Sequence, residues 1–103
     1  MSRSERSAVT LRTLAGTPLA DPDLERMIVS TAHAIAERQG VRILGIDTGP
    51  DHVTAEIGAG RVAAIGFAAE LRRVTEAWYR GKHGAQTLWG IPPVDDADAW
   101  KGG

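Results

Sequence analysis

Residues 41–67, "VRILGIDTGPDHVTAEIGAGRVAAIGF", are the part of this 103-residue sequence from which its fold class can be predicted. Val41–Asp47 and His52–Ile57 are short runs rich in β-branched and apolar residues, and the segment between them contains a glycine and a proline. This pattern is typical of a β-hairpin. From Arg61 onward, apolar residues recur every three or four positions, which predicts a helix directly after the second strand.

The register of this hairpin decides which side chains share a face of the sheet. Pairing Asp47 with His52 sets Leu44 and Ile46 opposite Ala55 and Val53 on one face. Val41 and Ile43 then share the other face with Thr54 and Glu56. Pro50 leaves the type of turn open, because it disfavours helical backbone angles at Gly49.

A helix is also predicted before the hairpin. Asp21 can cap its N-terminus, Pro22 suits the first helical position, and Gly40 supplies a left-handed C-terminal cap. The second helix is predicted from Arg61 to Arg80, with Gly81 ending it and Glu70, Arg73, Glu76 and Arg80 on its exposed face. One apolar stripe runs along each helix: Leu24, Met27, Ile28, Thr31, Ala34 and Ile35 on the first, and Ala64, Phe67, Ala68, Leu71, Val74 and Trp78 on the second.

The flanks add one strand at each end. Ala8–Leu14 alternates between apolar and polar residues, and Ala85–Ile91 is a short β-rich run before Pro92-Pro93. The resulting β-α-β-β-α-β order predicts a ferredoxin-like α+β fold, with both helices on one face of an antiparallel sheet. Residues 1–7 are a polar leader, 8–91 a single domain, and 92–103 an acidic tail that contains Trp100.

The stretch from Ile35 to Ile57, "IAERQGVRILGIDTGPDHVTAEI", resembles the middle of small amino-acid-binding regulatory domains and of microcompartment shell proteins. Both families have ferredoxin-like folds or permuted versions of that fold. The resemblance lies in the periodicity and implies the fold only.

Composition excludes several classes of function. Twelve basic and 13 acidic residues give a net charge of -1, whereas a nucleic-acid-binding domain usually carries a basic excess. The absence of cysteine excludes disulfides and thiolate metal sites. No run approaches the ~18 apolar residues of a membrane-spanning helix. We therefore expect a cytoplasmic protein without nucleic-acid or membrane partners.

The segment Gly58-Ala59-Gly60-Arg61-Val62-Ala63 fits the G-x-G-x-x-A pattern of dinucleotide-binding helices. The acidic residue expected roughly 20 positions later is missing, so no nucleotide cofactor is predicted. A smaller site is compatible with the pattern, because free N–H groups at a helix start can hold an anion. Gly58, Gly60 and Arg61 are the candidate anion-binding residues. Under the alternative that this turn is purely structural, Gly60 should need backbone angles that favour glycine.

Two further patterns in the sequence could indicate a functional site. Leu44–Gly49 resembles the Asp-Thr-Gly signature of aspartic proteases, but Pro50 departs from it, and two long helices do not belong to that fold. Asp47, Thr48 and Gly49 are therefore interpreted as turn formers. The three histidines, His33, His52 and His83, lack the spacing of a zinc site, so no metal is predicted.

These observations favour a non-catalytic, self-associating module that binds a small, anionic ligand or acts as a scaffold. The predicted register leaves apolar groups on the open face of the sheet, and exposed apolar surface usually marks an interface. Val41, Ile43, Thr54 and Trp100 are the candidate homo-oligomer interface; alternatively, the tail from Pro92 onward covers this face. The competing hypothesis is a small enzyme with a site between subunits around Asp47, His52 and Glu56.

Overall fold

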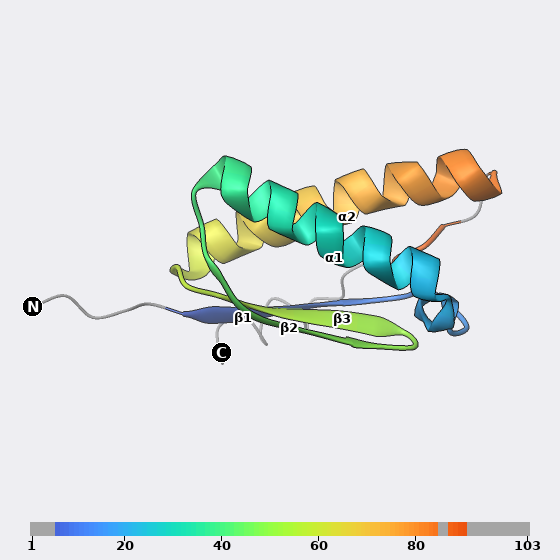
Figure 1. Cartoon of the computed structure of the whole chain (residues 1–103), viewed down its shortest axis with the longest axis horizontal. Coiled ribbons are helices and arrows are strands. Elements are labelled where there is room, and N and C mark those ends of the chain that lie inside the picture. Colours follow the sequence, from blue (N-terminus) through green and yellow to red (C-terminus); the bar gives the residue numbers. More distant parts are fainter. Residues whose placement is uncertain (1–5, 85–86, 91–103) are drawn as a thin grey trace, which may run out of the picture.

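Two helices cover one face of a three-stranded antiparallel sheet in the computed structural model, which describes residues 6–84 and 87–90 (Figure 1). The elements follow in the order β1 (Ser7–Arg12), a 3-10 turn η1 (Pro18–Ala20), α1 (Pro22–Gln39), β2 (Ile43–Gly49), β3 (His52–Ile57) and α2 (Arg61–His83). The sheet order is β1-β3-β2. The predicted α+β class, with both helices on one face of an antiparallel sheet, is therefore confirmed. No helix within the described residues has the length and apolar character needed to cross a membrane.

Local signals set both ends of α1, as the sequence predicts. The side chain of Asp21 accepts a hydrogen bond from the backbone N–H of Asp23 at 3.0 Å, and Gly40 ends the helix with a φ of 73°. The inner face of α1 is made of apolar side chains, of which the buried ones are Leu24, Ile28, Ala32, Ile35 and Ala36.

The second helix runs further than expected. Gly81 lies inside α2, which continues to His83, and Gly84 ends it with a φ of 76°. Two side-chain pairs span the last turns: the rings of Tyr79 and His83 lie 4.4 Å apart, and a Lys82 ammonium lies 5.2 Å from the Trp78 ring. Because i,i+4 pairs stabilise a helix, they offset the weak helix propensity of one glycine.

The β2–β3 hairpin differs from the expected register by two residues. Gly49, rather than Asp47, pairs with His52, and Asp47 pairs with Thr54. A shift of two residues leaves each side chain on its predicted face, because successive side chains alternate between faces. Val53, Ala55 and Ile57 accordingly point into the core.

A β-bulge at the start of β2 changes the faces of the residues before it. The register shifts between Ile43 and Gly45, so Leu44 is an extra residue in the ladder. Val41 and Ile43 consequently pack against the core instead of lying on the open face, and Leu44 is the large apolar residue that remains 40% exposed. The expectation that Val41 and Ile43 lie on the open face is therefore wrong.

The last predicted strand, Ala85–Ile91, is present in the described residues only as an isolated bridge between Thr13 and Trp89. Two backbone hydrogen bonds flank this bridge: the Leu14 N–H donates to Leu88 at 2.9 Å, and the Gly90 N–H donates to Arg12 at 3.0 Å. Residues 85, 86 and 91 lie outside the described residues. Among the described residues, Leu88–Gly90 are thus bonded beside β1 through one bridge, and the sheet itself has three strands.

Candidate functional site

The open face of the sheet is the side away from the helices (Figure 1). Its side chains form three rows across the strands, set by the strand registers: Arg12, His52 and Gly49; Thr10, Thr54 and Asp47; Ala8, Glu56 and Gly45. The hydroxyl oxygens of Thr10 and Thr54 lie 2.8 Å apart in the middle row. Every large side chain in these rows is polar, so these three rows do not provide the apolar surface expected there.

Of the four expected interface residues, the three that the structure describes are not brought together. Val41 and Ile43 pack against the core, whereas Thr54 lies on the open face as predicted. Trp100 lies outside the described residues. The physical reason is the bulge at Leu44, which the alternation of apolar residues alone does not reveal.

Asp47, His52 and Glu56 share the open face but do not converge. His52 and Glu56 are four residues apart on β3, which corresponds to about 13 Å at the usual rise of a strand. Asp47 lies in the row between them, opposite Thr54. A general acid and a general base must both reach the same reacting group. Within one chain, therefore, these three residues do not form a compact acid–base site.

The imidazole of His52 is held in a defined position by its neighbours. A methyl group on Gly49 would lie 2.4 Å from Cε1 of His52, so the ring occupies the space that glycine leaves free. Oδ1 of Asp51 lies 3.0 Å from Nδ1 of the ring. The hydrogen bond with His52 lowers the pKa of Asp51, against the opposing effect of desolvation. Sequence reasoning missed Asp51 as the partner of His52, although the two are adjacent in the turn.

The backbone between β3 and α2 is fixed by hydrogen bonds. The Gly58 N–H donates to the carbonyl of Arg42 at 2.8 Å, and the Ser7 hydroxyl donates to the carbonyl of Ala59 at 3.1 Å. Gly60 has a φ of -73° and a ψ of 178°, an extended conformation that any residue adopts. The expectation that Gly60 needs special backbone angles is therefore wrong.

The first turn of α2 differs from that of α1. Among the described residues no side chain caps it, and no acidic residue lies within it, in contrast to α1 with Asp21, Asp23 and Glu25. Arg61, at the first position of α2, is exposed. Anions are stabilised at helix N-termini, and the anion site at Gly58, Gly60 and Arg61 stays a prediction that rests on this general property.

Gly60→Asp should raise the free energy of unfolding by about 0.5 kcal/mol, because a carboxylate at this position can cap α2 and complement its dipole. The effect can be measured by urea unfolding followed by circular dichroism. Gly40→Asp is the control with the opposite sign: Gly40 has a φ of 73°, so a side chain there should cost about 1 kcal/mol. A Gly60→Asp variant that is no more stable than the wild type would contradict the capping interpretation.

The C-terminal half of α2 binds the backbone of the segment that follows it. The two carboxylate oxygens of Glu76 accept the N–H groups of Leu88 and Trp89, at 2.9 Å and 3.1 Å. The sequence predicted Glu76 on an exposed face, but its side chain is only 20% exposed. An ion pair with Arg80 is present and long, at 3.9 Å.

Side chains of α2 also hold the indole and the end of this segment. Nε1 of Trp89 donates to Oγ1 of Thr75 at 2.8 Å, and the Thr75 hydroxyl donates to the carbonyl of Leu71 at 2.6 Å. The guanidinium of Arg72 donates to the carbonyl of Gly90. Trp89 is 1% exposed. The segment is therefore an integral part of the core.

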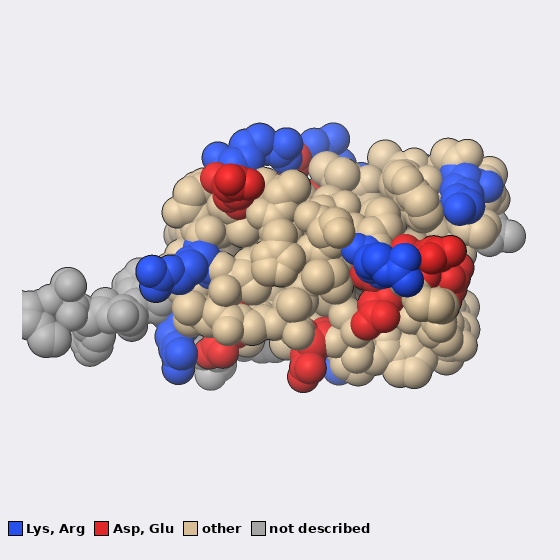
Figure 2. Space-filling view, in the orientation of Figure 1, with Lys and Arg blue, Asp and Glu red and all other residues tan. Residues whose placement is uncertain are grey.

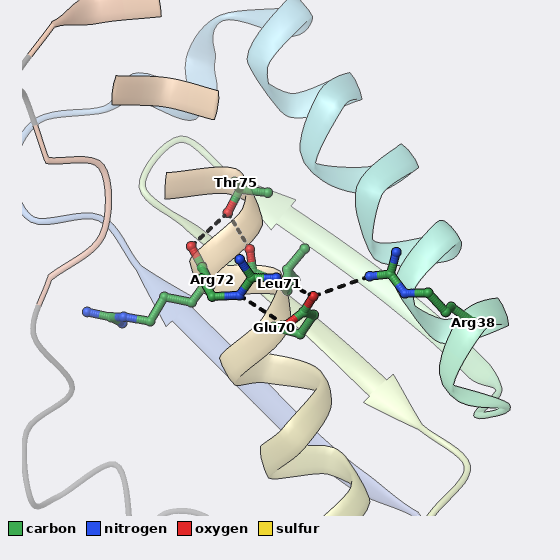
Figure 3. A network of polar contacts seen from close by, with 6 residues as sticks. Arg38, Glu70, Leu71, Arg72 and Thr75 are labelled. Atoms are coloured by element: carbon green, nitrogen blue, oxygen red, sulfur yellow. Dashed lines mark hydrogen bonds and ion pairs between the residues drawn. The ribbon is translucent and has the colours of Figure 1, made fainter. Parts of the chain in front are cut away.

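A polar network on the outer surface connects the two helices (Figure 3). Oε2 of Glu70 lies 3.3 Å from Nη2 of Arg38 on α1 and 2.6 Å from Nη2 of Arg73 on α2. The hydrogen bond with Arg73 lowers the pKa of Glu70, and Glu70 in turn raises the pKa of Arg73. Both arginine side chains are more than 60% exposed, so this network contributes little to stability.

On the face drawn in Figure 2, charges of both signs are present. Basic side chains lie close to acidic ones on the face drawn, and a wide uncharged area separates the charged groups. His33 is exposed, and the His83 ring lies beside Tyr79. Within residues 6–84 and 87–90, no three metal-binding side chains lie close enough together to hold an ion.

Comparison with protein-family models finds no match for this chain, and comparison with curated proteins finds none either.

Proposed function

We propose that this chain is a non-catalytic, self-associating module that binds a small anion at the first turn of α2. The observation that carries the proposal is the uncapped, acid-free start of this helix beside the exposed Arg61. Backbone N–H groups and a guanidinium are complementary to phosphate, sulfate or carboxylate. A cytoplasmic location is part of the proposal and is supported by the absence of cysteine.

Phosphate and sulfate should raise the melting temperature more than chloride does at equal ionic strength. Arg61→Ala should abolish this gain, because it removes the guanidinium at the first position of α2. Gly60→Asp should also abolish it, since its carboxylate would occupy the same N–H groups. Arg26→Ala is the matched control, because Arg26 is also exposed but lies on α1, in an ion pair with Asp23. Equal gains in all four proteins would show that the anion acts elsewhere or through general salt effects, and would reject the site.

The competing function, a small enzyme with a site between subunits around Asp47, His52 and Glu56, is favoured by one observation. The ring of His52 is oriented by Asp51 and by the space at Gly49, as expected for a side chain that exchanges protons with a substrate. The distance between His52 and Glu56 counts against this function in a single chain. A second chain would have to supply the missing acid or base.

We also propose that the fold has the ferredoxin-like topology predicted from the sequence. It requires the segment Leu88–Gly90 to be the centre of a fourth strand on the outer edge of β1. The bridge between Thr13 and Trp89 and its two flanking hydrogen bonds support this assignment. The sheet order would then be this fourth strand, β1, β3 and β2, with the fourth strand at one edge and β2 at the other.

A further inference from the structure

Within the part of the chain that the structure describes, β2 forms a free edge of the sheet. The order β1-β3-β2 places it on the outside, while the opposite edge, on β1, is partly covered by Leu88–Gly90. Among the described residues, no backbone hydrogen bond reaches the outer side of Ile43–Gly49. Figure 1 looks onto this edge, with α1 above it, and Figure 2 shows mainly uncharged atoms over the same region.

This edge has few of the features that normally prevent strands of different molecules from pairing. Such features are short strands, lysine or proline within the strand, bulges and covering segments. β2 is seven residues long and contains no lysine, arginine or proline. Its bulge affects only the first part, so Gly45–Gly49 remains regular. Asp47 is the one charged residue on the strand.

The hairpin geometry determines which backbone groups face outward. Gly49 and His52 close the turn, so Gly49, Asp47 and Gly45 direct their backbone groups toward β3. The alternate residues, Ile46 and Thr48, direct theirs away from the sheet. An incoming strand would therefore bond to Ile46 and Thr48.

We propose that this edge pairs with β2 of a second copy, antiparallel and with the two-fold axis at Ile46. The proposal rests on the proposed self-association and gives it a location. If Ile46 paired with Thr48 of the second copy, the two Asp47 side chains would lie directly opposite each other, and like charges in that position are destabilising. With Ile46 opposite Ile46, each Asp47 lies opposite Gly45 of the second copy, without a charge clash. Charge therefore disfavours the Ile46–Thr48 register. A register with Thr48 opposite Thr48 would place Ile46 opposite Pro50, which has no N–H to donate, so the Ile46–Ile46 register is preferred.

Pairing in this register would join two three-stranded sheets into one, with both α1 helices on the same side. Ile46 is only partly buried and packs against the core, so the second copy would cover its remaining exposed surface. Two-fold symmetric dimers are the commonest homo-oligomers, and closing two edges against each other leaves no further free β2 edge for growth.

Opposite charge substitutions at Gly45 test this register. A side chain fits there, because nothing lies within 4 Å of a Cβ added at this position. Gly45→Lys creates two opposite-charge pairs with Asp47 across the dimer and should tighten it about tenfold, whereas Gly45→Asp creates two like-charge pairs and should weaken it by a similar factor. Gly45→Asp combined with Asp47→Lys should restore the dimer. Ala8→Lys and Ala8→Asp are matched controls, because Ala8 is exposed on the far edge strand, and they should change nothing.

The dimer constants can be measured by sedimentation equilibrium, with circular dichroism to verify that each variant folds. A wild-type dimer that responds equally to Lys and Asp at position 45 would overturn the β2 pairing and leave self-association standing. A wild-type chain that is monomeric at high micromolar concentration would overturn both. Dimers whose stability depends on Ala8 instead would move the interface to the other edge.

Discussion

Trp89→Ala should lower the free energy of unfolding by about 3–5 kcal/mol, the range for deleting a buried aromatic side chain. Trp89 is 1% exposed, and its indole N–H has a hydrogen-bond partner, Thr75, inside the protein. Removing the ring leaves a cavity between α2 and the edge of β1 and leaves the Thr75 hydroxyl without its donor. Urea unfolding followed by far-UV circular dichroism measures the loss without relying on tryptophan fluorescence.

Trp78 provides a matched control for this substitution. It is also a tryptophan on the α2 side of the molecule, but it is 39% exposed and contacts the flexible side chain of Lys82. Trp78→Ala should therefore cost less than half as much as Trp89→Ala. Equal losses for the two variants would show that the Leu88–Gly90 segment is not a special part of the core.

Glu76→Ala should have the second largest effect, a loss of about 2–4 kcal/mol. The substitution leaves the N–H groups of Leu88 and Trp89 without their acceptors, and each unsatisfied buried donor costs about 1–3 kcal/mol. Glu76→Gln should fall between the wild type and Glu76→Ala, because it retains one acceptor oxygen and loses the charge. The same urea unfolding experiment measures both variants.

Glu37 on α1 is the control for Glu76. It is exposed, so Glu37→Ala should change stability by no more than about 0.5 kcal/mol. If Glu76→Ala behaved like Glu37→Ala, water would be satisfying the two N–H groups as well as the carboxylate does. The anchoring role assigned to Glu76 would then be incorrect.

The elements that could be predicted from sequence are those whose signals are local. Asp21, Pro22 and Gly40 define α1 because a cap acts within one turn of the residue that supplies it. The hairpin was predicted because its strands and turn are contiguous. Gly81 misled the prediction of where α2 ends, because a glycine near a helix end resembles a cap whether or not the helix continues.

The features that could not be predicted depend on distant residues. The bulge at Leu44 moves Val41 and Ile43 into the core, and only packing against the helices selects that arrangement. Glu76 looked like a surface residue because its partners, Leu88 and Trp89, lie a dozen or more positions later in the chain. Of the candidate sites, the start of α2 was recognisable from its glycines, whereas the setting of His52 required the structure.

The pairing of β1 has a consequence for the order in which the chain can fold during synthesis. Of the three strands, β1 leaves the ribosome before the other two, yet its partners are β3 on one side and the segment Leu88–Gly90 on the other. β3 is translated only after more than half of the described residues, and Leu88–Gly90 is the last described segment to be translated. The β2–β3 hairpin, by contrast, can form as soon as it emerges, because its strands are adjacent in the chain. The earliest strand is therefore the last to have both neighbours, and the nascent protein exposes its edge to other molecules until Trp89 arrives.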